Sequence, residues 1–188
     1  MNRAIAMVLL SCGVTLGAVV AQEPKVNPDA KLLLDFKKRV DGYMEMQRSL
    51  ERKAPPLKQT EDPAKIKASQ DALAALIRSS RATAKQGEIF TPEIAQLFRR
   101  LMYPETKGAQ GKETKQAIKE DAPNPKAVPL KVNARYPDSA PLPTVPPNLL
   151  ASLPQLPDDL EYRIIGNDLI LRDVQANVIV DYMPKAIR

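Results

Sequence analysis

Five aspartates near the end of the chain are the residues whose type and spacing come closest to supporting chemistry. Two carboxylates held near each other can bind Ca²⁺ or act as acid and base on a glycan. Their spacing matches neither an EF-hand loop nor another known ligand pattern, and aspartate is an ordinary turn residue. We expect them to organise turns, and keep a carboxylate-dependent hydrolase of envelope polymers as an alternative. The five are Asp158, Asp159, Asp168, Asp173 and Asp181.

The composition excludes most other catalytic chemistry. The 188 residues contain no His, no Trp and one Cys, Cys12. This removes imidazole acid-base catalysis, His-ligated zinc and any internal disulfide. Glycine-rich phosphate loops, HExxH and GxSxG are also missing, and Ser79 and Ser80 sit between arginines without a nucleophile motif. We therefore expect no catalytic, cofactor-binding or metal-binding residues.

Residues 1–21 are typical of a secretory signal peptide. An uncharged apolar run from Ala4 to Ala21 ends in small residues. We expect cleavage near Ala21 and a periplasmic or extracellular protein. Two alternatives stay open: an uncleaved anchor, because 18 apolar residues approach the length of a membrane-spanning helix, and a lipidated Cys12, because Leu9–Cys12 loosely resembles a lipobox.

The basic excess lies in the first half of the chain. Residues 22–104 contain 16 Lys and Arg against 11 Asp and Glu, whereas residues 105–188 contain 11 of each. Such an excess favours an anionic envelope component, an acidic partner protein or peripheral membrane contact, through salt-sensitive attraction. We expect no nucleic-acid partner, because no basic patch is interleaved with aromatic residues.

Three start signals predict three helices over residues 28–104. In Asn27–Pro28, Asp62–Pro63 and Thr91–Pro92 a capping residue precedes a proline. Apolar residues spaced by three and four then predict helices from residue 28 to about 53, from 63 to about 85 and from 92 to about 103. We expect helical hairpin packing, with Ile89 and Phe90 wedged between the second and third helices.

Residues 105–158 predict a charged and then proline-rich linker. The part up to residue 121 is compatible with a frayed helix or a mobile loop. Ten of the 35 residues from Pro123 to Pro157 are proline, which favours extended backbone. Interspersed leucines predict a strap lying along a surface, with one helical turn at 148–153. A rigid spacer or a PxxP ligand is the alternative.

Residues 159–188 predict a small three-stranded antiparallel meander. Strand-forming runs flank Gly166–Asn167, as in a tight hairpin, and a third run follows a second turn. Arg163, Arg172 and Asp181 are expected on one face. The opposite, apolar face needs a cover, by default the chain's own helices. A partner adding a strand to an open edge is the alternative. The fold class is therefore α+β.

The candidate interaction surface combines basic helical clusters with this apolar face. The alternative interpretation of the basic clusters, without an interaction, is a helix face that is exposed to solvent. The basic residues are Lys37, Lys38, Arg39, Arg99 and Arg100. The sheet residues are Tyr162, Ile164, Leu169, Leu171, Val178, Val180 and Tyr182.

Two stretches carry a resemblance. They are GEIFTPEIAQLFRRLMY, residues 87–103, and EYRIIGNDLILRDVQANVIVDYMPKAI, residues 161–187. They resemble short exported bacterial proteins of unknown function with a GxIFTPE segment and a strand-rich C-terminal segment. The resemblance implies export and a recurring design, without an activity. With the missing catalytic motifs, it leads us to expect a non-catalytic interaction protein of the envelope or periplasm whose partner is unidentified.

Overall fold

Each of the three start signals begins a helix in the structure, a computed structural model that describes residues 27–55, 60–122 and 128–187. The predicted signal peptide and Cys12 lie outside these residues. Side-chain oxygens of Asn27, Asp62 and Thr91 accept hydrogen bonds from main-chain N–H groups of the first helical turns. The three helices are α1 (Pro28–Glu51), α2 (Pro63–Ser80) and α3 (Pro92–Met102).

Helix α2 ends at Ser80, about five residues before the predicted end. Arg81 leaves the helical conformation, with φ −113° and ψ 33°. Its main-chain oxygen accepts a hydrogen bond of 2.8 Å from the side-chain amide of Asn133, which is 52 residues away in the sequence. A tertiary contact therefore terminates α2. Gly87 lies in the following loop with φ +92°.

The charged stretch after α3 is helical. A short 3-10 helix, η1 (Pro104–Thr106), leads into α4 (Gly108–Asp121). The predicted turn in the strap is α5 (Pro147–Ser152). The strap packs against the helices and the sheet: Val145, Leu149 and Leu153 bury their side chains in the main core. This confirms the prediction that the strap lies along a surface.

The last residues form the predicted meander, which confirms the α+β class. Strands β1 (Leu160–Ile165), β2 (Asp168–Asp173) and β3 (Val178–Met183) pair antiparallel in the order β1-β2-β3. Gly166 turns the first hairpin with φ +60°, a conformation that glycine adopts without strain.

A bulge in β3 changes which side chains face the helices. Leu171 pairs with Asp181 and Arg172 with Ile179, so that Val180 is an extra residue. Beyond the bulge the alternation is reversed: Asp181 faces the helices, and Tyr182 packs on the opposite face. A strict period of two predicted the opposite faces for Asp181 and Tyr182, and both predictions are wrong.

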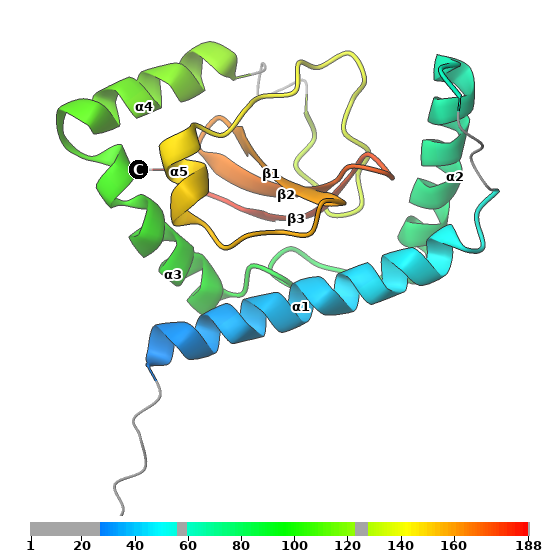
Figure 1. Cartoon of the computed structure of the whole chain (residues 1–188), viewed down its shortest axis with the longest axis horizontal. Coiled ribbons are helices and arrows are strands. Elements are labelled where there is room, and N and C mark those ends of the chain that lie inside the picture. The colour runs from blue at the N-terminus through cyan, green and yellow to red at the C-terminus, as the bar shows by residue number, and fades with distance from the viewer. Residues whose placement is uncertain (1–26, 56–59, 123–127, 188) are drawn as a thin grey trace, which may run out of the picture.

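Helices and strap enclose the sheet from both sides (Figure 1). Helix α1 runs along one face, with α3 near its start and α2 near its end. The core between this face and α1, α3 and α5 contains Phe36, Phe90 and Phe98, whose ring centroids are 4.9 to 6.1 Å apart. Ile89 and Phe90 are 3% and 1% exposed in this core, where Phe90 packs against Phe36 of α1 and Phe98 of α3. The buried residues of α2 belong to another cluster, and α2 and α3 lie at opposite ends of α1 (Figure 1), so the predicted hairpin packing with a wedge between these two helices is wrong.

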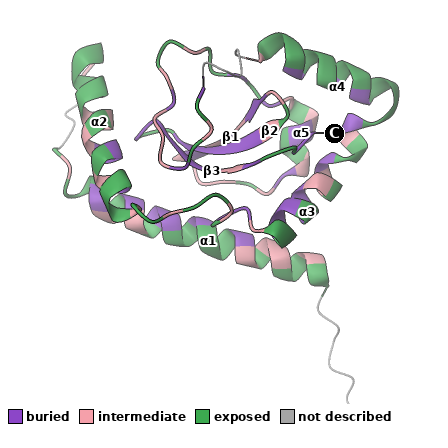
Figure 2. Cartoon of the chain, turned by 180° about the vertical axis from the view of Figure 1, so that it is seen from behind, coloured by how far each residue is buried: buried purple, intermediate pink, exposed green. Residues whose placement is uncertain are grey.

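The second face of the sheet is covered by the first part of the strap. Val128 and Tyr136 pack against Ile165, Ile170 and Ile179. A third cluster joins the ends of α1 and α2 to the β2–β3 turn. Figure 2 shows the result: buried residues gather in the strands and along the inner sides of α1 and α3, while most of α2 and α4 is exposed.

Candidate functional site

The five aspartates do not converge on one site. Asp173 and Asp181 are 0% exposed, and each binds a different set of groups of this chain. Asp168 accepts from the main chain of Lys185, and Asp159 from the side chain of Gln175. Asp158 is exposed. Across the part of the chain that the structure describes, no cluster of His, Cys, Asp and Glu has the geometry to hold a metal ion.

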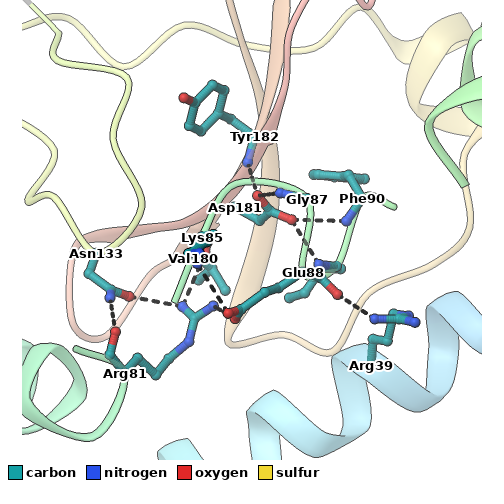
Figure 3. A network of polar contacts seen from close by, with 11 residues as sticks. Arg39, Arg81, Lys85, Gly87, Glu88, Phe90, Asn133, Val180, Asp181 and Tyr182 are labelled. Atoms are coloured by element: carbon teal, nitrogen blue, oxygen red, sulfur yellow. Dashed lines mark hydrogen bonds and ion pairs between the residues drawn. The ribbon is translucent and has the colours of Figure 1, made fainter. Parts of the chain in front are cut away.

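Asp181 fastens the loop between α2 and α3 to β3 (Figure 3). Its carboxylate accepts hydrogen bonds from the main-chain N–H groups of Gly87, Ile89 and Phe90, at 2.9, 2.8 and 2.9 Å. Its oxygens are thus occupied by the loop that wraps them. The segments 87–103 and 161–187 meet at this carboxylate.

Arg81 extends the network to the strap (Figure 3). Its guanidinium donates to the main-chain oxygen of Val180 and to the side chain of Asn133, both at 3.0 Å, and pairs with Glu88 at 3.2 Å. Arg39 of α1 donates to the main-chain oxygen of Glu88 at 2.7 Å. These groups join α1, α2, β3 and the strap, and we assign them a structural role.

Asp173 forms a second buried polar cluster, between α1 and the β2–β3 turn. The hydroxyl of Tyr43 donates to it at 2.7 Å, and so does the main-chain N–H of Ala176. Burial raises the pKa of Asp173, and the nearby charge of Asp159 adds to the increase, against the lowering effect of these hydrogen bonds. Burial likewise raises the pKa of Tyr43 well above its ordinary value. A carboxylate with no exposed surface is inaccessible to a polymer substrate.

The predicted basic surface is largely neutralised by neighbouring groups. Lys37 pairs with Asp41 at 2.6 Å and Arg39 with Asp35 at 3.0 Å, both across one turn of α1. Arg100 pairs with Asp29 at 2.6 Å. Lys38 is exposed on α1. Arg99 donates to the main-chain oxygens of Pro184 and Lys185. Arg99 thus helps hold the C-terminal segment against α3.

The apolar face of the sheet is part of the chain's own core. Six of the seven sheet residues considered for interaction are at most 4% exposed, and Tyr182 is half-buried on the opposite face. The face is therefore covered by the helices, as the default prediction stated, and offers no surface to a partner. The six are Tyr162, Ile164, Leu169, Leu171, Val178 and Val180.

The outer edge of β3 is closed by the chain itself. The main chain of Ile179 exchanges hydrogen bonds with Asn133 and Ala134 of the strap, both at 2.8 Å. Further along, the main-chain oxygens of Val180 and Tyr182 accept from the side chains of Arg81 and Gln86. No second strand can pair there without displacing these groups.

The outer edge of β1 is different. The N–H of Val174 donates to Asp159 O, which places the odd-numbered residues of β1 in hydrogen-bonded pairs with β2 and turns the main chain of Tyr162 and Ile164 outward. The N–H of Leu160 is used by Pro157 O. Within residues 27–55, 60–122 and 128–187, no hydrogen bond from outside the sheet reaches the main chain of Tyr162 or Ile164. Both residues are nevertheless buried, at 4% and 1% exposed, so other groups of the chain cover this edge and it is not open to an added strand.

A groove of about 880 Å³ lies between this edge and the strap. The strap is held at both sides of β1: Arg163 donates to Pro143 O and the Tyr162 hydroxyl to Pro154 O, both at 3.1 Å. Leu150 is 49% exposed there. The groove is lined by Thr144, Val145, Pro147, Leu150, Ala151, Leu153, Pro154, Gln155, Leu156, Asp158, Leu160, Glu161, Tyr162 and Arg163.

Glu161 anchors the polar side of the groove. It forms ion pairs with Arg163 and Arg172. Burial acts to raise the pKa of Glu161, but the hydrogen bonds from the two guanidinium groups outweigh it and hold the pKa below its ordinary value. Arg172 also donates to Asn177 at 2.8 and 3.0 Å. Both cations are therefore committed to groups of this chain.

No protein family, no curated protein and no solved structure matched the chain. The helices in the described ranges include none that combines the length and the apolar character needed to cross a bilayer. The groove between β1 and the strap is the candidate site.

Proposed function

We propose that this is a non-catalytic, exported protein of the envelope or periplasm that binds a partner polypeptide in the groove between β1 and the strap. The observation that supports this most directly is the apolar side chain of Leu150, which is 49% exposed in this groove. The two edges of the sheet are closed: the edge of β3 is hydrogen-bonded to the chain's own strap and side chains, and Tyr162 and Ile164 of β1 are 4% and 1% exposed.

The groove suits the apolar side chains of a partner for physical reasons. Leu150 is 49% exposed in it, and Leu153 and Leu156 line the same wall. Covering such apolar surface with a partner's side chains removes it from water and favours binding. The sheet behind the groove is held by two buried networks, so that the groove is preorganised.

The separated aspartates support the non-catalytic part of the proposal. Asp173 and Asp181 are bound by groups of this chain and have no exposed surface. A hydrolase would need two accessible carboxylates on one substrate. The groove instead brings together apolar side chains of the strap and β1, which favours binding over catalysis.

Site-specific crosslinking in cells tests the binding site. Leu150→p-benzoylphenylalanine, in the groove, is expected to give a discrete crosslinked adduct on illumination. The same replacement at Leu34 or Val174, which are 67% and 36% exposed away from the groove, is expected to give none. Adducts of equal yield at all three positions would contradict the proposal.

A blocking variant provides the second arm. Ala151 lines the groove and is exposed, so Ala151→Trp fills the groove without entering the core. It is expected to abolish the Leu150 adduct. The matched control is Ala75→Trp on the exposed side of α2, which should leave the adduct unchanged. An adduct that survives Ala151→Trp would place the partner elsewhere.

Mass spectrometry of the native protein tests the export proposal. We expect a mature chain that begins at Gln22 and is released with the periplasmic or extracellular fraction. A chain that retains Met1, or one that begins at a lipidated Cys12, would instead show membrane anchoring.

A further inference from the structure

A second pocket lies between α3, η1 and the C-terminal segment, and it shares no lining residue with the groove beside β1. Its volume is about 610 Å³, within the range of pockets that hold small ligands. Arg99 fixes one wall, because it donates to the main-chain oxygens of Pro184 and Lys185. The pocket is lined by Gln96, Arg99, Arg100, Tyr103, Thr106 and Ala186.

The geometry of α3 brings four of these side chains together. Positions separated by three, four and seven residues lie on one face of a helix. This face is the outer one, since the buried residues of α3 point into the core. Gln96 and Arg100 are exposed, and so is Tyr103, at 49%. The four are Gln96, Arg99, Arg100 and Tyr103.

Two cations at this face can receive an anionic group. The ammonium of Lys107 lies 4.2 Å from the centre of the Tyr103 ring, and no carboxylate of the described residues pairs with it. Arg100 pairs with Asp29 at 2.6 Å, but the two side chains are 56% and 47% exposed. Such an exposed pair is weak, so a ligand's carboxylate can compete for the guanidinium, whose fork matches its two oxygens.

Neutral polar groups lie beside these cations. In the part of the chain that the structure describes, no hydrogen bond engages the Gln96 amide or the Tyr103 hydroxyl. Both groups can donate and accept hydrogen bonds, as the hydroxyl groups of a sugar require. The tyrosine ring adds an apolar surface for the C–H groups of a sugar ring. A concave site with both kinds of group suits a ligand that carries carboxylates and hydroxyls together.

We propose that this pocket binds acidic sugar units, of the uronic acid type, in an anionic polysaccharide. Arg100 and Lys107 bind the carboxylates, and Gln96 and Tyr103 bind the hydroxyl groups. Arg99 keeps its contacts with the C-terminal segment and holds that wall in place. The site goes beyond the proposed function, because its ligand is a second one and its position is independent of the groove.

Isothermal titration calorimetry of the mature protein with tetragalacturonate tests the proposal. The methyl ester of the same oligosaccharide keeps the sugar rings and removes the charges. We expect tetragalacturonate to bind and its methyl ester to bind at least about tenfold more weakly. Binding of tetragalacturonate should also weaken at high salt, as for exposed charges.

Paired substitutions locate the binding. Arg100→Gln combined with Lys107→Gln should weaken tetragalacturonate binding by at least about fivefold, as expected for the loss of two exposed charge contacts. The matched control combines Arg78→Gln with Lys85→Gln. It removes the same charge from exposed positions near the end of α2, at the other end of α1 (Figure 1), and should leave the affinity unchanged. Circular dichroism verifies that both variants fold.

A single substitution tests the contact with a sugar hydroxyl. Tyr103→Phe removes the hydroxyl and keeps the ring, and it should weaken tetragalacturonate by about two- to tenfold. An unchanged affinity would contradict the assigned contact and leave a site for charge alone.

The remaining outcomes would overturn the proposal. No binding of tetragalacturonate, or equal losses in the two paired variants, would rule out this pocket as its site. Binding of phosphatidylglycerol vesicles or of inorganic phosphate in its place, lost on Arg100→Gln with Lys107→Gln, would assign the pocket to another anion. None of these variants alters the groove, so the crosslinked adduct from position 150 should persist in all of them, and either proposal can fail without the other.

Discussion

Asp181 and Asp173 illustrate two ways in which a buried carboxylate is accommodated. The oxygens of Asp181 meet main-chain N–H groups of the loop at Gly87, Ile89 and Phe90. Asp173 meets a tyrosine hydroxyl and one main-chain N–H, and its pKa is raised by burial. Asp181 therefore holds the loop in place as a hydrogen-bond acceptor. Ionisation of Asp173, by contrast, destabilises the folded state, because its pKa is raised in that state.

Replacing Asp181 with asparagine should destabilise the fold by about 2–4 kcal/mol. The amide nitrogen would oppose N–H donors and leave at least one of them buried without an acceptor. Urea unfolding measures the change. The control Asp168→Asn affects one hydrogen bond, to Lys185 N–H, and should cost less than about 1 kcal/mol. Equal losses in the two variants would contradict the role given to Asp181.

Asp173 predicts a specific dependence of stability on pH. Because its folded pKa is raised from 3.8, the folded state holds this proton more tightly than the unfolded state. The wild type should lose this contribution as the pH rises from about 4 through the folded pKa. Asparagine does not ionise, so the Asp173→Asn variant has no such loss. Over the same pH range, the free energy of unfolding of the variant should therefore rise relative to that of the wild type. A difference that is constant with pH would refute this assignment.

The helices show what local sequence could predict. The pairs Asn27–Pro28, Asp62–Pro63 and Thr91–Pro92 begin α1, α2 and α3 because capping and proline geometry act within a few residues. The end of α2 could not be predicted, because Asn133 caps it from a distant segment. The helical state of α4 was left open, since its residues are mostly exposed and its packing depends on η1.

Two glycines in helices should respond in opposite ways to alanine. A Cβ at Gly111 of α4 would lie 2.2 Å from the main-chain carbon of Thr106 in η1, whereas a Cβ at Gly42 of α1 meets nothing within 4 Å. Gly111→Ala should destabilise by about 1–3 kcal/mol through overpacking. Gly42→Ala should stabilise by about 0.5–1 kcal/mol through helix propensity. Thermal unfolding of both variants decides, and a stabilising Gly111→Ala would disprove the close contact.

The sheet shows where a local pattern fails. Strands and turns were predicted because period-two patterns and Gly166 are local signals. The bulge at Val180 is not a local signal: it places Asp181 under the loop that needs a carboxylate acceptor. The pattern therefore predicted the wrong face of the sheet for Asp181, and also for Tyr182.

At the scale of the whole molecule, the strap closes the sheet at both edges. Its first part hydrogen-bonds to β3 through Asn133 and Ala134, and its later part accepts hydrogen bonds from Tyr162 and Arg163 of β1 and leaves a groove beside them. That the strap lies along the body could be inferred from its leucines. The position of the groove could not, because it depends on where a proline-rich segment with few secondary-structure signals lies in space.

Photocrosslinking from position 150 in cells tests the central claim most directly, that the groove between β1 and the strap binds a partner polypeptide. Because Leu150 is 49% exposed in this groove, its replacement by p-benzoylphenylalanine should give a discrete adduct, and Ala151→Trp should remove that adduct. The same replacement at Leu34, which is 67% exposed on α1, should give none. No adduct at position 150, or an adduct that survives Ala151→Trp, would contradict the account.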